Sequence, residues 1–148
     1  MALEVDQSIK VEQTSEDTTL ALSNDEQFAI VIPAHVKREA IVYLRQKGWY
    51  GQRAILACFA AGLFLLLRRS QAQSSLIVID QEYEGHERNI KSILLRYLRC
   101  ADIGIAEDVI AFGRVGKSSG AHRLAWAVHR GKCAPNHTVT LEEFLSVL

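Results

Sequence analysis

The amino-acid sequence predicts an α/β protein with a mixed sheet, in which antiparallel N-terminal strands are followed by alternating helix-strand units. Two short apolar runs, TTLALS (18–23) and FAIVIP (28–33), flank the turn signal Asn24-Asp25 and indicate an antiparallel pair. Two later runs, LIVID (76–80) and DVIAFG (108–113), are separated by about 27 residues with a helical pattern. A connection of that length requires a parallel pair joined through a helix.

The N-terminal residues 1–17 mix acids with Gln, Ser and Thr, and could form a flexible tail with one weak strand at SIKVEQ (8–13). We therefore expect a single α/β domain over 18–148. After Pro33, apolar residues at helical spacing predict a helix that Gly48 ends.

A second helix is expected from about residue 52 to 69, and it contains the apolar run AILACFAAGLFLLL (54–67). As a helix these 14 residues span about 21 Å, against roughly 30 Å of hydrocarbon in a bilayer. We interpret the run as a buried central helix and expect no membrane partner; an interfacial or membrane helix is the alternative.

Three more helices follow. Ile90, Leu94 and Leu98 recur at helical spacing after the LIVID strand, and SSGAHRLAWAVHR (118–130) has an apolar stripe. At the C-terminus, Thr140 followed by Glu143 forms the capping-box pattern of a short helix.

The charge distribution bears on whether the protein binds nucleic acid, and the cysteine content bears on its cellular compartment. The formal net charge is zero, yet residues 1–27 hold seven acids against one lysine, whereas residues 113–132 hold five bases and no acid. If the bases share a face, nucleic acid is a plausible partner; scattered solvated charges are the alternative. The cysteine count of three, with no CxxC pair and no signal-peptide pattern, favours a soluble protein of the reducing cytoplasm.

Four acids, Asp80, Glu82, Glu84 and Glu87, follow directly after the LIVID strand. In α/β sheets ligands collect at the carboxyl ends of parallel strands, and Mg²⁺ or Mn²⁺ prefers oxygen ligands. These acids could therefore form a metal site. Alternatively, the glutamates only complement the dipole at the start of a helix.

The order of elements from about residue 8 to 130 resembles the ribonuclease H-like superfamily. The resemblance implies metal-binding carboxylates on the first strand, first helix, fourth strand and last helix. Asp80 matches the fourth strand, Glu39 the first helix, and His122 the last helix. Neither Asp6 nor Asp17 falls inside a predicted strand, so the first-strand position stays unassigned.

The segment AFGRVGKS (111–118) fits a relaxed phosphate-loop pattern. Only 30 residues follow it, which is too few for the later strand and acidic magnesium ligand of a phosphate-loop nucleoside triphosphatase. Its glycines and the following helix start could still receive a nucleic-acid phosphate, with Lys117, Ser118 and Arg123 as binding residues. A glycine-rich turn with Ser119 as helix cap is the alternative.

The sequence therefore predicts a divalent-metal-dependent nuclease, a hydrolase of DNA or RNA phosphodiester bonds. Its expected catalytic residues are Asp80, Glu84 and His122, and its expected metal ligands, for Mg or Mn, are Asp80, Glu84 and Glu39. Two alternatives remain open. The chain could be a noncatalytic α/β module that binds nucleic acid or a protein, and His122 could merely pack on its helix beside His129.

Overall fold

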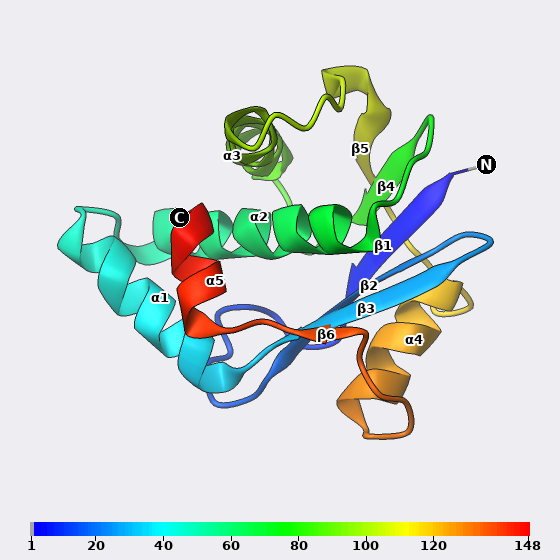
Figure 1. Ribbon diagram of the computed structural model, residues 1–148, viewed down its shortest axis with the longest axis horizontal. Coiled ribbons are helices and arrows are strands. Elements are labelled where there is room, and N and C mark those ends of the chain that lie inside the picture. Colours follow the sequence, from blue (N-terminus) through cyan, green and yellow to red (C-terminus); the bar gives the residue numbers. More distant parts are fainter. Residues whose placement is uncertain (1) are drawn as a thin grey trace.

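The computed structural model describes residues 2–148 and has a six-stranded mixed sheet with helices on both faces (Figure 1). The strand order is β5-β4-β1-β2-β3-β6. The strands are β1 (Leu3–Gln7), β2 (Thr18–Ser23), β3 (Gln27–Ile32), β4 (Ile77–Asp80), β5 (Ile110–Gly113) and β6 (His137–Thr138). This arrangement confirms the predicted fold class.

The first three strands are antiparallel, whereas β4 and β5 run parallel to β1 and extend the sheet beyond it. The prediction for the N-terminus is wrong in one respect. The first strand is Leu3–Gln7 and not the segment 8–13, and it lies between β2 and β4 inside the sheet. Residues 3–7 are therefore part of the α/β domain and not of a flexible tail.

The helices are α1 (Ala34–Gln46), α2 (Gly51–Ser70), α3 (Glu87–Cys100), α4 (Gly120–His129) and α5 (Leu141–Val147), with a short 3₁₀ helix η1 (Glu107–Val109) before β5. Helix α2 packs on β2 and β3, and α1, α3 and α5 pack against α2 (Figure 1). Helix α4 alone among these helices packs across β1, β2 and β3 on the opposite face.

Helix α2 is the centre of the larger core, because nearly every residue from Ala54 to Leu67 is buried. By length and composition alone α2 could cross a membrane, but 72% of its most apolar window is buried within the protein. This burial is typical of the core helix of a soluble protein, as the sequence predicted.

The C-terminal segment returns to the sheet and is held there by polar contacts. Thr140 caps α5 by accepting a hydrogen bond from the Glu143 backbone N–H at 3.1 Å, as predicted. The Glu143 carboxylate binds Arg69 of α2 and, at 2.7 Å, His137 of β6. The short strand β6, which the sequence did not predict, pairs with β3.

Candidate functional site

The side-chain alternation of β1 places its acids on one face of the sheet. Leu3 and Val5 point into the main core beneath α2, so Glu4 and Asp6 project toward α4 on the other face. In the parallel pairing, Val5 lies beside Ile79 of β4. One residue further along, Asp6 and Asp80 therefore meet at the carboxyl ends of the two strands.

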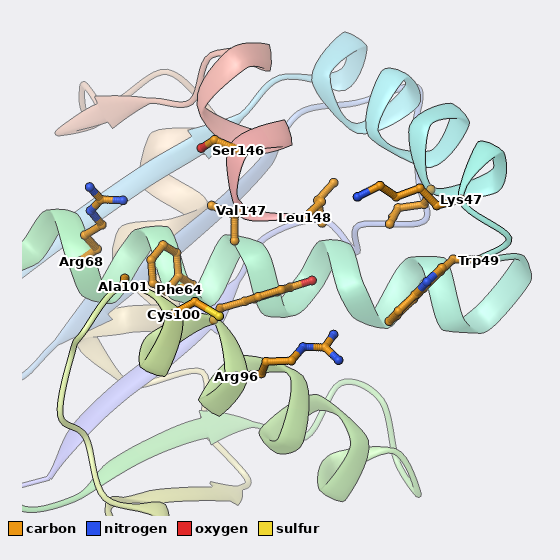
Figure 2. A pocket seen from close by; sticks show the side chains of 12 residues that line it. Lys47, Trp49, Phe64, Arg68, Arg96, Cys100, Ala101, Ser146, Val147 and Leu148 are labelled. Atoms are coloured by element: carbon orange, nitrogen blue, oxygen red, sulfur yellow. The ribbon is translucent and has the colours of Figure 1, made fainter.

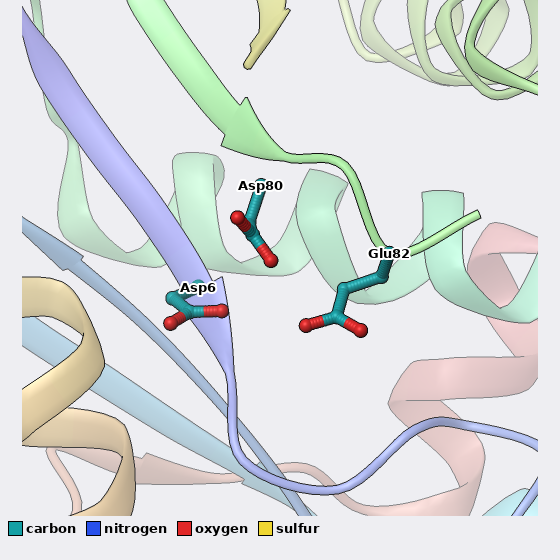
Figure 3. A group of neighbouring side chains, drawn as sticks. All are labelled: Asp6, Asp80 and Glu82. Carbon is teal, nitrogen blue, oxygen red and sulfur yellow. The ribbon is translucent and has the colours of Figure 1, made fainter. Parts of the chain in front are cut away.

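Three carboxylates converge at this point, those of Asp6, Asp80 and Glu82 (Figure 3). One oxygen from each lies within 4.8 Å of the others. Asp80 is held in place by the backbone N–H of Val115, in the loop after β5, which donates to its Oδ1 at 2.8 Å. Among residues 2–148, no lysine or arginine lies within ion-pair distance of these three groups.

Helix α4 contributes His122, whose Nδ1 lies 2.8 Å from Asp6 Oδ2. The other Asp6 oxygen accepts the Gln7 backbone N–H at 2.8 Å, so both oxygens are oriented. Burial raises the pKa of Asp6, whose side chain is almost fully enclosed, and the Asp80 charge adds to this rise; the two hydrogen bonds oppose it. An ionised Asp6 can only accept, so the hydrogen bond is donated by His122 Nδ1.

Glu82 has the most strongly perturbed acidity of the group. Burial raises its pKa to about 7, and its hydrogen bond with Asp80 and the charges of Asp80 and Asp6 act in the same direction. The three carboxylates thus crowd negative charge into a small volume, which a proton on Glu82 or a bound cation would relieve. Oxygen ligands that converge in this way fit Mg²⁺ or Mn²⁺.

The carboxylates line a cavity of about 350 Å³, together with basic groups and an aromatic ring from the β5–α4 loop and α4. Among its lining residues are Glu84, Arg114, Lys117, His122 and Trp126. The cavity thus combines acids that could bind a divalent cation with cations that could bind an adjacent phosphate.

No protein-family model, curated protein or solved structure matches this chain. The site must therefore be interpreted from its own geometry and chemistry.

Several residues predicted from the sequence meet in this cavity, namely Asp80, Glu84, His122 and Lys117. Glu84 is exposed at its rim, and Glu82 takes the place that the sequence analysis gave to Glu84 in the carboxylate cluster. Glu39 is exposed on α1 and is not part of the cluster or of the cavity lining. The structure therefore does not bring Glu39 together with Asp80 and Glu84, the other metal ligands expected from the sequence.

The predicted phosphate-binding residues divide between two places. Arg123 is exposed on α4 and lines an adjoining hollow with Lys117, while Ser118 is exposed in the loop. Ser119 caps α4 by accepting the Ala121 N–H, and its hydroxyl donates to Glu4 at 2.9 Å. The loop therefore has the cap that the alternative interpretation required.

Gly120 serves the packing of α4 on the sheet. A Cβ at this position would lie 2.4 Å from Ser23 Oγ on β2, so only glycine allows the start of α4 to approach so closely. Ala125 then packs on Ala21 and Ala29, where small side chains keep helix and sheet close together. The close packing brings His122 within reach of Asp6.

Sequence reasoning missed Asp6 and Glu82 as members of the cluster. The alternation of Leu3 and Val5 with Glu4 and Asp6 was a strand signal, but it was short and lay in an acidic segment. Glu87 instead serves the helix start: it lies in the first turn of α3, and its carboxylate accepts the Gly85 N–H at 3.1 Å.

A second, larger hollow of about 600 Å³ lies between α1, α2, α3 and the C-terminal helix (Figure 2). Its charged side chains are Lys47, Arg68 and Arg96, around Trp49 and Phe64, and no carboxylate side chain lines it. It lies away from the carboxylate cluster, and no group of acidic side chains that could hold a metal lines it.

Proposed function

We propose that the protein is a divalent-metal-dependent nuclease that hydrolyses phosphodiester bonds of DNA or RNA. The observation that carries the proposal is the meeting of Asp6 on the central strand with Asp80 at the end of the neighbouring parallel strand, with Glu82 beside them. Asp6 supplies the first-strand carboxylate that a ribonuclease H-like nuclease needs, and the strand order supports membership of that superfamily.

The residues present fit a divalent cation. Asp6, Asp80 and Glu82 offer hard oxygen ligands, and their crowded negative charge is what such an ion would neutralise. A bound Mg²⁺ or Mn²⁺ would activate a water molecule and stabilise the developing charge on the phosphate.

The other side chains have separate tasks in this proposal. Asp6 fixes the orientation of His122, so that Nε2 can take up or deliver a proton within the cavity. Lys117 and Arg114 offset the negative charge of a phosphate that approaches the carboxylates. Glu84, exposed at the rim, is placed to affect substrate entry rather than the cluster itself.

We also propose a cytoplasmic location for this activity. All three cysteines are free thiols, and Cys100 and Cys133 are exposed. Exposed thiols of this kind persist in a reducing compartment.

The test is cleavage of labelled single-stranded, duplex and branched DNA and of an RNA–DNA hybrid, with Mg²⁺, with Mn²⁺ and with EDTA. We expect metal-dependent cleavage that falls at least about 100-fold in Asp80→Asn and in Asp6→Asn. Asp108→Asn, an exposed acid in η1, is the matched control and should cleave normally.

The substitution Asp80→Asn can keep the hydrogen bond from Val115 because its amide oxygen is still an acceptor. A loss of activity in a folded variant therefore reports on the carboxylate charge. If the folded wild-type protein cleaves none of these substrates with either metal, the nuclease proposal is wrong, and the noncatalytic nucleic-acid-binding module takes its place.

A further inference from the structure

Another hollow, of about 510 Å³, adjoins the carboxylate cavity along α4. The two share the lining residues Lys117, His122 and Trp126, so they lie side by side. Arg123, Ala127 and Arg130 line the new hollow at spacings of three and four residues, which places them on one face of the helix. We refer to this 510 Å³ hollow as the α4 groove. It is lined by Lys117, His122, Arg123, Trp126, Ala127, Arg130 and Lys132.

The two adjoining hollows differ in charge. The α4 groove is lined by four cationic side chains, two arginines and two lysines, and by no acid. The adjoining cavity contains Asp6, Asp80 and Glu82. A polyanion with one phosphate near a cation at the carboxylates would place its next phosphates among these bases.

Trp126 lines both hollows and therefore lies between the acidic and the basic hollow. Its ring is only partly buried, and the Arg130 guanidinium lies 5.4 Å from the ring centroid. His129 packs edge-on at 5.4 Å on the same ring. An accessible indole beside cations is the arrangement that single-stranded nucleic-acid sites use, because every base offers a π face to stack.

We infer that the α4 groove binds an unpaired stretch of nucleic acid, with a base stacked on Trp126 and the flanking phosphates on Lys117 and Arg130. Bases inside a duplex are stacked on one another and cannot offer a face to the indole. The favoured substrate of the proposed nuclease is therefore single-stranded or branched, with the unpaired segment next to the scissile bond. This last step rests on the proposed function, whereas binding in the groove does not.

The test measures binding without cleavage, through Trp126 fluorescence in EDTA. The chain has two tryptophans, so in the Trp49→Phe variant all tryptophan fluorescence comes from Trp126. Titration with an oligothymidylate should quench this emission in a saturable way, and a blunt duplex of equal length should quench it far less. Affinity should fall steeply with salt.

Variants then separate stacking from charge. Trp126→Ala should weaken oligothymidylate binding, measured by anisotropy of a labelled strand, by about 5- to 150-fold, the range for one lost base–aromatic stack. Trp49→Ala is the matched control and should bind as wild type. Arg130→Gln leaves the indole in place and should both weaken binding and reduce its salt dependence, which keeps the test valid if Trp126→Ala does not fold.

Three results would overturn the inference: equal quenching by single strand and duplex, equal affinity of the folded Trp126→Ala and Trp49→Ala variants, or polyglutamate binding as tightly as the oligonucleotide. The two proposals also fail separately. Metal-dependent cleavage without Trp126 quenching refutes the α4 groove alone, whereas quenching without cleavage by any substrate refutes the nuclease alone.

Discussion

At the scale of single residues, the raised pKa of Glu82 sets a pH dependence of stability. Glu82 has a pKa of about 7 in the folded protein against 4.5 for an ordinary glutamate. Between these values the folded protein binds more protons than the unfolded chain, so this group contributes less stability as the pH rises from about 4.5 to about 7. Above that range its contribution is constant.

Asp80→Asn should remove much of this dependence. The change deletes the neighbouring charge that, after burial, raises the pKa of Glu82, so that pKa should move back toward 4.5. Thermal unfolding in EDTA at pH 5, 6, 7 and 8 measures this change. The melting temperature of Asp80→Asn minus that of wild type should increase between pH 5 and pH 7. Asp108→Asn should follow wild type, and parallel curves for all three proteins would contradict this account of Glu82.

Divalent cations should stabilise the protein more at high pH, because protons and cations compete for the same carboxylates. We expect Mn²⁺ to raise the melting temperature more at pH 8 than at pH 6, where Glu82 is largely protonated. The shift should disappear in Asp6→Asn. A shift of equal size at both pH values would place the cation somewhere other than this cluster.

At the scale of the elements, the position of α4 depends on its first residue. Gly120 lies where a Cβ would contact Ser23, and the Asp6–His122 contact lies two residues further along the same helix. The distance between α4 and the sheet is therefore coupled to the geometry of the site.

Gly120→Ala should destabilise the protein by about 1–3 kcal/mol, the usual cost of overpacking, and should also lower any metal-dependent activity. Gly104→Ala is the matched control, because a Cβ there meets nothing within 4 Å. Urea unfolding and activity assays measure both effects. Ser23→Ala removes the atom nearest to the new methyl group and should partly restore stability to the Gly120→Ala protein. A Gly120→Ala single variant as stable as wild type would contradict the close approach of α4 to β2.

Glu143 adds polar contacts to the apolar packing of helix α5 on α1 and α2. Burial alone would raise the pKa of Glu143, but its contacts with His137 and Arg69 lower it overall. A carboxylate with a lowered folded-state pKa contributes stability above about pH 4.5 and loses that contribution as the pH falls through its folded-state value.

Glu143→Gln should therefore cost about 1 kcal/mol at neutral pH and little at pH 3, because it removes the charged partner of Arg69 and His137. Glu142→Gln changes an exposed acid in the same helical turn and should have almost no effect. Denaturant unfolding at the two pH values gives the comparison. Equal losses for both variants would mean that only the charge of the turn matters, and not the contacts of Glu143.

At the scale of the whole molecule, β1 joins the antiparallel and parallel parts of the sheet. Removal of residues 2–7 should abolish cooperative urea unfolding, followed by circular dichroism, because β2 and β4 would lose their shared neighbour. Removal of residue 2 alone should leave the transition unchanged. A cooperative transition in the longer deletion would restore the expectation from the sequence that residues 1–17 form a flexible segment outside the α/β domain.

The sequence predicted the elements that have clear apolar patterns or caps, and it missed strands β1 and β6. Helices α1 to α4 and strands β2 to β5 have clear periodicities and stop signals, and their positions agree with the structure within a few residues. Strand β1 has only two inward apolar residues, Leu3 and Val5, so its alternation is a short signal, and β6 has just two residues in all and gives no pattern. Their places depend on tertiary pairing, which local sequence does not encode.

The same limit applied to the site. Asp80 and His122 were identified because they follow from strand and helix positions, whereas Asp6 needed the correct first strand. The choice between Glu82 and Glu84 depended on how the chain turns after β4, where the Glu82 N–H bonds to the Asp80 carbonyl at 2.9 Å. A turn of that kind cannot be read from a run of acids.

The pairing of Asp6 with His122 also has a consequence for synthesis in the cell. The two residues are 116 positions apart, so a growing chain carries Asp6 from the start but lacks its partner until α4 has left the ribosome. Strand β1 must likewise wait for β4 before its second edge is covered. A chain without β4 therefore cannot bring Asp6 beside Asp80, and a chain without α4 lacks the Asp6–His122 contact.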